Sequence, residues 1–229
     1  STDLERAAAG ADVVIEAVAE KLEIKLDIFR RLDACCPPAT ILASNSSTLI
    51  PSKLAPAVRR PERLLVAHYW NPPFLLPLVE IVGSPQTSPQ ALETMRQLLL
   101  QLGKMPVVMK KEALGFIGNR LQFALWREAL HIVEAGIASP EDVDAVVRNS
   151  FGRRLAIAGP FEVFESAGLD VIYGANSYVM PDLDNSTSPS PILAEKVRKG
   201  ELGIKTGKGF YTWTPESGAP QEPGEVPGR

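Results

Sequence analysis

Histidine and cysteine are both scarce in this sequence of 229 residues. His68 and His131 are its two histidines, so proton transfer by an imidazole near neutral pH has only two candidate residues. The two cysteines, Cys35 and Cys36, are adjacent, which excludes a disulfide framework and a metal site of ordinary cysteine spacing. We therefore expect no bound metal. Reduced cysteines, together with the lack of a signal peptide, favour a cytoplasmic location.

Strong net charge and long apolar runs are also lacking. The 24 Lys and Arg residues nearly balance the 27 Asp and Glu residues, for a formal net charge of −3. This balance predicts neither a nucleic acid nor an anionic membrane surface as a partner. No uninterrupted apolar run approaches the length of a membrane span. Hydrophobic residues nevertheless make up 45% of the chain, which is enough for a sizeable core and excludes a wholly disordered protein.

In the first half of the chain, apolar segments alternate with helical patterns. Strands are expected at residues 10–18, 40–44, 64–68, 78–82 and 107–109, where apolar residues follow one another. Helices are expected at residues 21–36, 51–58 and 88–102. Strands that alternate with helices predict an α/β domain with a mostly parallel sheet.

The second half carries helical patterns, expected at residues 115–135, 139–149, 160–179 and 191–199. We place a domain boundary near Lys110, so that residues 1–109 form the sheet domain and residues 110–213 form a helical domain. Residues 214–229 hold four prolines and three glycines with hardly an apolar side chain, which predicts a disordered tail.

His68 ends a predicted strand, and the carboxyl ends of strands line the ligand crevice in open α/β sheets. If the strands at 64–68 and 78–82 form a hairpin with its turn centred on Phe74, His68 and Glu80 lie directly opposite each other. A carboxylate on one imidazole nitrogen would leave the other nitrogen as a general base. The pattern leaves a second interpretation open, in which Glu80 is an exposed strand charge without a partner and His68 is structural.

Polar residues at two further places are candidates for substrate contact, each with a local alternative. Ser44-Asn45-Ser46-Ser47-Thr48 follows a predicted strand, where its hydroxyls either bind a substrate oxygen or form turns and helix caps. Asn119 lies in the first turn of an apolar helix, and its amide either caps the helix or reaches a ligand. His131, between two apolar helical residues, is interpreted as structural. The Gly-x-Gly-x-x-Gly fingerprint of a dinucleotide site does not occur in the sequence.

Five motifs occur in the order typical of one known family. They are the segments Ser44–Leu49, Ala67–Pro72, Leu78–Glu80, Gly115–Arg120 and Lys205–Tyr211. With these motifs the sequence resembles the short-chain L-3-hydroxyacyl-CoA dehydrogenases, including their lambda-crystallin and L-gulonate 3-dehydrogenase branch. The resemblance covers nearly the whole chain up to Tyr211. It implies a Rossmann-type NAD-binding domain followed by an all-helical domain that packs against its copy in a homodimer.

The resemblance also implies roles for individual residues. His68 would be the general base that takes the proton of the substrate's 3-hydroxyl while a hydride passes to NAD, and Glu80 would orient it. Ser47 and Asn119 would hydrogen-bond the reacting oxygen and the neighbouring carbonyl of this small-molecule substrate. Asn71 would hold the adjoining loop. The implied NAD contacts are Glu20, Lys25, Ser47 and Lys205.

Members of this family begin with a strand, a glycine-rich turn and a helix whose N-terminus takes the pyrophosphate. This sequence starts after that unit, part-way through the dinucleotide domain. We therefore expect a truncated Rossmann-type sheet, very weak NAD binding and little dehydrogenase activity from the chain as it stands. Exposed strand edges would make stability depend on dimerisation.

The implied substrate is an L-3-hydroxyacyl-CoA, oxidised to the 3-ketoacyl-CoA as in fatty acid β-oxidation, because the motif Lys205–Tyr211 is typical of that branch. The segments Leu49–Leu54 and Asn71–Pro73 instead resemble the lambda-crystallin branch, whose substrates are small polar hydroxy acids. A non-catalytic crystallin-like protein and a dimerisation module made of the helical half are the alternatives from other functional classes. The presence of all four implied catalytic residues argues against the non-catalytic protein.

Overall fold

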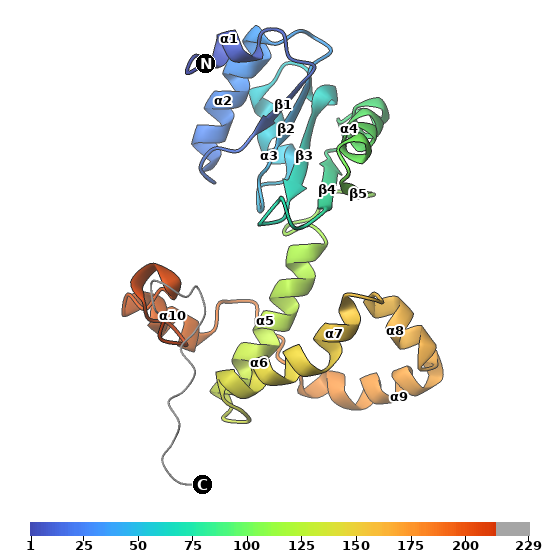
Figure 1. Ribbon diagram of the computed structural model, residues 1–229, viewed down its shortest axis with the longest axis vertical. Helices are drawn as coiled ribbons and strands as arrows, with labels where there is room; N and C mark the ends of the chain where they lie inside the picture. Colours follow the sequence, from blue (N-terminus) through green and yellow to red (C-terminus); the bar gives the residue numbers. More distant parts are fainter. Residues whose placement is uncertain (214–229) are drawn as a thin grey trace. The chain divides into compact units, whose positions relative to one another are not determined.

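The computed structural model describes residues 1–213, so the predicted disordered tail at 214–229 lies outside the described residues. The chain divides into two compact units, one formed by Ser1–Gln122 and the other beginning at Phe123. Figure 1 shows that the first unit contains the sheet and that the described part of the second consists of helices joined by loops.

A five-stranded sheet with the order β1-β2-β3-β4-β5 forms the first unit. Its strands are β1 (Val13–Glu16), β2 (Ile41–Ser44), β3 (Leu64–Tyr69), β4 (Leu78–Gly83) and β5 (Met105–Val108). Neighbouring strands are parallel except for β3 and β4, which pair antiparallel. The expected α/β domain with a mostly parallel sheet is confirmed. Because β1, β2 and β3 run in the same direction, their carboxyl ends meet at one edge of the sheet.

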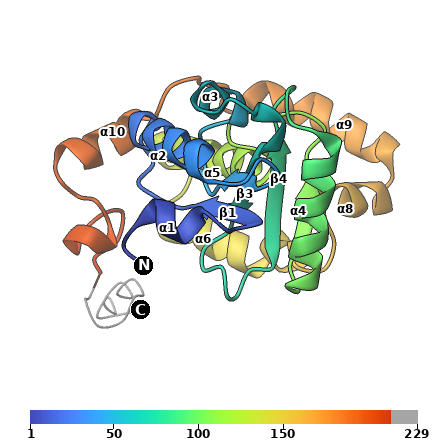
Figure 2. The ribbon, with the colours of Figure 1, turned by 90° about the horizontal axis from the view of Figure 1, so that it is seen from above.

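Helices cover both faces of this sheet, as Figure 2 shows. α2 (Leu22–Cys35) and α3 (Pro51–Leu54) lie on one face, and α4 (Pro89–Gln101) lies on the other. Side chains of successive strand residues point to opposite faces of the sheet. Leu42 and Leu64 pack into the cluster that contains Phe29 of α2, whereas Leu65 packs into the cluster that contains Met95 of α4. The two clusters fix the sheet, and with it the loops at the carboxyl edge.

The observed boundaries differ from the expected ones at several places. β1 spans Val13–Glu16 rather than residues 10–18, because the Glu16 carboxylate accepts a hydrogen bond from the Val18 N–H and the chain leaves the sheet there. β5 begins at Met105 rather than at residue 107. The short helix α1 (Leu4–Ala8) is not among the expected elements, since five residues are too few to show an apolar period.

The second unit is helical, as expected. α5 (Gly118–Glu134) begins in the first unit and continues into the second, which also contains α6 (Pro140–Asn149), α7 (Phe151–Leu155), α8 (Pro160–Ser166), α9 (Leu169–Val179) and α10 (Pro191–Arg198). The helical pattern expected at 160–179 is formed by two helices, α8 and α9, which are separated at Gly168, whose φ is 90°. α7 is a further unexpected element. No helix within residues 1–213 is both long enough and apolar enough to cross a membrane.

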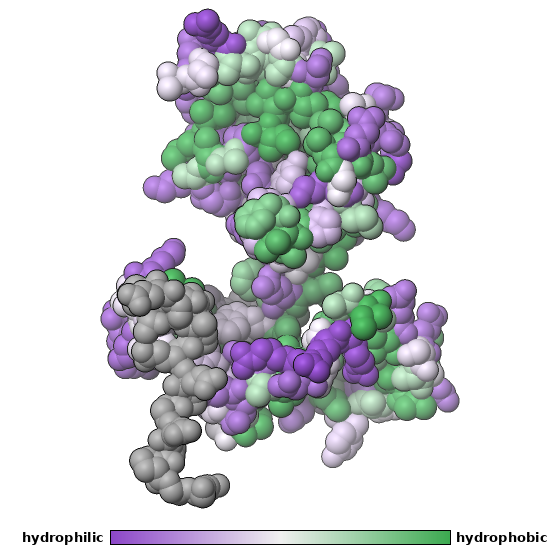
Figure 3. Space-filling model, in the orientation of Figure 1, coloured by the Kyte–Doolittle hydropathy of each residue, from purple (hydrophilic) through white to green (hydrophobic). Residues whose placement is uncertain are grey.

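Apolar side chains reach the surface of both units, as Figure 3 shows. Among the described residues from 123 onward, Leu130 is the one buried apolar residue. Ile157, Phe161 and Tyr178 are 90%, 86% and 88% exposed. These apolar side chains are therefore largely exposed within the described residues.

Candidate active site

His68 and Glu80 face each other across the antiparallel pair β3 and β4. They are register partners in this hairpin, and His68 Nδ1 lies 2.9 Å from Glu80 Oε2. Both side chains are buried, with 5% and 1% of their surface exposed. The expected hairpin is therefore confirmed, and the alternative of an exposed, unpartnered Glu80 is wrong.

Three further donors hold the Glu80 carboxylate. Trp70 Nε1 donates to Oε2 over 3.2 Å, and the backbone N–H groups of Ile117 and Gly118 donate to Oε1 over 2.9 and 3.0 Å. Burial raises the pKa of Glu80, but the hydrogen bonds from His68, the Gly118 and Ile117 amides and Trp70 outweigh it and lower the pKa below its ordinary value. Glu80 is thus an ionised acceptor. The proton it accepts must sit on His68 Nδ1, so that in the neutral imidazole the lone pair lies on Nε2.

Ser47 lies on the Nε2 side of the imidazole. Its Oγ is 3.2 Å from His68 Nε2, and Asn119 Nδ2 donates to the Ser47 carbonyl oxygen over 3.2 Å. Ser47 is exposed and Asn119 is half-buried, so both side chains remain within reach of a ligand. The structure therefore brings together His68, Glu80, Ser47 and Asn119, which come from four separate segments of the chain.

A second cluster of charged groups lies at the carboxyl end of β1. Lys25 is 1% exposed, and its Nζ lies 2.8 Å from Glu16 Oε1 and 3.3 Å from Glu20 Oε2. Ser44 at the end of β2 donates to Glu16 Oε2 over 2.6 Å. Because isolated buried charges are very costly, this pairing explains how Lys25 and Glu16 can be buried together. The positive charge of Lys25 is therefore paired within the protein. The Glu20 side chain, in contrast, is 38% exposed.

Glu20 connects this cluster to the loop that carries Ser47. Its Oε1 accepts hydrogen bonds from the Ser46 hydroxyl and from the Thr48 hydroxyl at 2.9 Å and amide at 3.1 Å. Burial raises the pKa of Glu20, but these hydrogen bonds and the charge of Lys25 lower it to about 2. Since Ser46 and Thr48 flank Ser47, the ionised Glu20 carboxylate fixes the loop beside His68.

Sequence reasoning missed several residues that shape the site. Glu16 is a lone charge at the end of an apolar strand, and that pattern could have identified it as a buried ionic partner. Phe116 is fully buried, has a φ of 52° and packs its ring 5.2 Å from the His68 ring. Gly118 leaves no room for a side chain, because a Cβ there would lie 2.2 Å from Trp70 Cζ2. Neither Phe116 nor Gly118 carries a local sequence signal for these contacts.

The remaining predicted residues lie elsewhere. Lys205 is exposed in the short turn Ile204–Thr206 of the helical unit, and its NAD contact stays a prediction. His131 is half-buried in the last turn of α5. Asn71 is exposed in the loop after β3. Within the described residues, no group of three or more His, Cys, Asp or Glu side chains is arranged to hold a metal ion.

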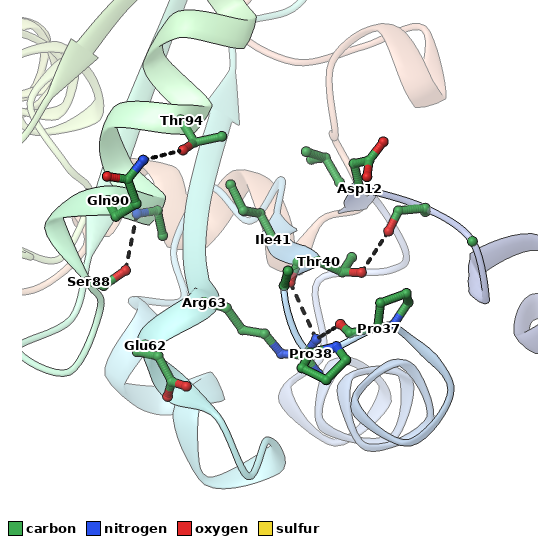
Figure 4. Close-up of a pocket in the computed structure, with 15 residues that line it drawn as sticks. Asp12, Pro37, Pro38, Thr40, Ile41, Glu62, Arg63, Ser88, Gln90 and Thr94 are labelled. Carbon is green, nitrogen blue, oxygen red and sulfur yellow. Dashed lines mark hydrogen bonds between the residues drawn. The ribbon is translucent and has the colours of Figure 1, made fainter.

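A hollow of about 500 Å³ lies at the amino ends of β1, β2 and β3. Figure 4 shows side chains that line it. Asp12, Thr40 and Gln90 line it together with Arg63. The Arg63 guanidinium donates to the Pro37 carbonyl and pairs with Asp33, so its charge is used within the chain. This hollow lies at the opposite end of the strands from His68 and does not belong to the candidate active site.

Relatives of known activity resemble this chain over most of its length. The 5-formyl-3-hydroxy-2-methylpyridine 4-carboxylate 5-dehydrogenase of Mesorhizobium japonicum is 39% identical over 214 residues, which are 93% of this chain and 69% of the relative. An L-carnitine dehydrogenase of a Pseudomonas species is 40% identical over 74% of this chain. The matched part is 53% of that relative, so the chain spans about half the length of the carnitine enzyme.

Solved structures of such enzymes share the fold. A crystal structure of the pyridine carboxylate dehydrogenase, described as an NAD⁺-dependent dismutase, superposes with a TM-score of 0.91 at 39% identity over 93% of this chain and 69% of that one. The (S)-3-hydroxybutyryl-CoA dehydrogenase PaaH1 from Ralstonia eutropha gives a TM-score of 0.75 at 31% identity over 93% of this chain and 74% of that one.

Both parts of the chain match models of one family. Residues 1–113 match the NAD-binding domain of 3-hydroxyacyl-CoA dehydrogenases, and residues 115–213 match their C-terminal domain. The two matches together cover nearly all of the described residues, in agreement with the motifs in the sequence. The chain therefore belongs to the 3-hydroxyacyl-CoA dehydrogenase family of NAD-dependent oxidoreductases.

Proposed function

We propose that the protein oxidises a secondary hydroxyl group to a carbonyl group, with NAD as the hydride acceptor and His68 as the general base. The observation that carries this proposal is the His68–Glu80 pair, in which a buried, ionised carboxylate holds Nδ1–H and leaves Nε2 free beside Ser47. The membership in a dehydrogenase family supports it.

His68 Nε2 takes the proton of the substrate hydroxyl as the carbonyl forms and the hydride leaves the same carbon. The imidazole becomes positively charged in this step, and the Glu80 carboxylate, 2.9 Å away, stabilises that charge. Ser47 Oγ and the Asn119 amide provide hydrogen bonds for the reacting oxygen and the neighbouring substrate carbonyl. The positions of these groups orient the substrate hydroxyl towards Nε2.

The carboxyl edge of the sheet offers groups that suit a nicotinamide nucleotide. The partly exposed Glu20 carboxylate and the exposed hydroxyls of Ser47 and Thr48 can pair with ribose hydroxyl and carboxamide groups. NAD, when bound, supplies the acceptor for the hydride. In this arrangement Lys25 does not contact NAD directly, because its Nζ is enclosed by the carboxylates of Glu16 and Glu20. It instead holds the Glu20 carboxylate in place for the contact with NAD. Lys205 is proposed as a further contact from the helical unit.

Two substrate classes agree with this chemistry. An L-3-hydroxyacyl-CoA is the class that the C-terminal motif Lys205–Tyr211 favours, and it would place the protein in fatty acid oxidation. A small hydroxy acid is favoured by the relative named for L-carnitine. The name of the other relative specifies the 5-formyl group of a pyridine carboxylate, which is an aldehyde and not a secondary alcohol. A panel of 3-hydroxybutyryl-CoA, L-carnitine and gulonate, with NADH formation as the measurement, separates the classes. Turnover of the CoA ester alone would exclude the small acids as substrates. Turnover of a small acid without turnover of the CoA ester would exclude the thioester.

The role of His68 is tested by replacement with glutamine. His68→Gln should lower kcat/KM by about 10²–10⁴-fold, the usual contribution of a general base. His131→Gln is the matched control, because it removes the other imidazole of the chain from a position outside the site. Equal rates for the two variants would refute the proposal.

A further inference from the structure

Trp70 lies directly after β3, and its indole reaches back to the His68–Glu80 pair. The indole Nε1–H donates to Glu80 Oε2 over 3.2 Å, and the same oxygen accepts from His68 Nδ1 over 2.9 Å. The Trp70 and His68 rings are also in contact, with centroids 5.6 Å apart and planes inclined by 58°. An indole N–H only donates, so Trp70 can influence proton transfer only through these neighbours.

The Trp70 indole packs closely against the start of α5. A Cβ at Gly118 would lie 2.2 Å from Trp70 Cζ2 and 3.0 Å from Cη2. The Gly118 N–H meanwhile donates to Glu80 Oε1 over 3.0 Å. The backbone of α5 thus holds one oxygen of Glu80, while Trp70 and His68 share the other.

We propose that Trp70 is a positioning residue that tunes the His68–Glu80 pair by sharing the carboxylate oxygen that holds the imidazole. A donor on a carboxylate oxygen stabilises the anion, and the oxygen then attracts a second proton less strongly. With Trp70 in place, Glu80 stabilises a charged imidazole less than it would alone, so that His68 is free to act as a base at lower pH. This inference rests on the proposed role of His68 as the general base.

The variant Trp70→Phe tests the inference, because it keeps an aromatic ring beside His68 and removes the N–H. The acid limb of the kcat/KM profile reports protonation of the free enzyme's base. In Trp70→Phe this limb should move to higher pH by up to about one unit, the size expected when one hydrogen bond to a charged group is lost. A role in packing alone would lower the rate equally at every pH, and an unmoved limb would overturn the inference.

Tyr69→Phe is the matched control. Tyr69 precedes Trp70, and its side chain packs on the other face of the sheet, in the cluster that contains Met95. The variant removes one polar group from the neighbouring aromatic residue but leaves Glu80 with all its donors. Its acid limb should coincide with that of the unmodified protein, and an equal displacement in both variants would contradict the inference.

A measurement without turnover separates this inference from the proposed function. With His131→Gln as background, His68 is the single imidazole, and its ¹⁵N signals can be followed against pH by NMR. Trp70→Phe should shift this titration to higher pH, and an unshifted titration would overturn the inference. A shifted titration in a protein that turns over no substrate of the panel would support the inference and contradict the proposed function.

The hydrogen bond itself has an independent test if Trp70→Phe does not fold. Glu80→Gln removes the charge that the indole N–H faces, so the Trp70 indole N–H resonance should move upfield from its position in the unmodified protein. An unchanged resonance would show that the indole does not bind the carboxylate and would overturn the inference.

Discussion

Two carboxylates beside the proposed base are held ionised by different sets of donors. Glu80 is almost fully buried and accepts from an imidazole, an indole and two backbone amides. Glu20 is partly exposed and accepts from the loop that carries Ser47. The first carboxylate orients the proposed base, and the second orients the hydroxyl that lies next to it. At the scale of single residues, the site therefore depends on acceptors that stay charged over a wide pH range.

Glu20→Gln should make the folded protein less stable, with an effect that depends on pH. The pKa of Glu20 is about 2 in the folded chain and has an ordinary value of 4.5, so its charge stabilises the fold fully above pH 4.5. This contribution is lost as the pH falls from 4.5 to about 2. Urea unfolding midpoints of the two proteins should therefore differ most above pH 4.5 and converge towards pH 2. A difference that is constant over this range would contradict the assigned hydrogen bonds.

The element that organises the site is the β3–β4 hairpin, closed by the first turn of α5. The hairpin register places His68 opposite Glu80, and two amides donate to the same carboxylate, that of Gly118 at the start of α5 and that of Ile117 just before it. Glu80 also complements the positive end of the helix, which stabilises a negative charge there. The start of α5 is thus part of the site and not only a connection between the units.

Gly118→Ala should destabilise the first unit by about 1–3 kcal/mol, because its Cβ would overlap the Trp70 indole and one of them must move. Gly174→Ala in α9 is the matched control. A Cβ at Gly174 meets no atom within 4 Å, and alanine is favoured over glycine in a helix interior by roughly 0.5–1 kcal/mol. Urea unfolding should show opposite signs for the two variants. A stabilising Gly118→Ala would contradict the close approach of Trp70.

The sequence predicted those parts of the site that depend on local pattern. Alternation and spacing were enough for the hairpin and for the pairing of His68 with Glu80, because strand register follows from the positions of the strands. The contacts of Trp70 and Gly118 could not be derived in this way, because they depend on where the first turn of α5 packs against Trp70 and Glu80. The burial of Lys25 was missed for a similar reason. From the sequence, a charged residue of α2 is expected at the surface, and the buried position of Lys25 is explained only by the Glu16 carboxylate beside it.

The whole molecule combines a packed sheet unit with a helical unit whose apolar side chains lie largely exposed. The sheet unit has a buried cluster on each face, whereas Leu130 is the one buried apolar residue described from position 123 onward. We propose that a second copy of the chain covers the helical surface, which is the homodimer that the motifs implied.

Sedimentation equilibrium at micromolar concentration should give twice the mass of the chain. Phe161→Ser, which replaces a side chain that is 86% exposed in the helical unit, should weaken this dimer without lowering the stability of the sheet unit. The matched control is Phe74→Ser, since Phe74 is 82% exposed in the sheet unit and should leave the dimer unchanged. A monomer at all concentrations would contradict the proposed partner.

The central claim is that His68, oriented by Glu80, is the base that accepts the substrate proton. The most direct test compares the pH profile of kcat/KM for the unmodified protein with that of His68→Gln, using NAD and the best substrate of the panel. The unmodified protein should lose activity through a single protonation on the acid side, whereas His68→Gln should be about 10²–10⁴-fold slower with that limb abolished. An acid limb that persists unchanged in His68→Gln would show that another group takes the proton, and would contradict the account.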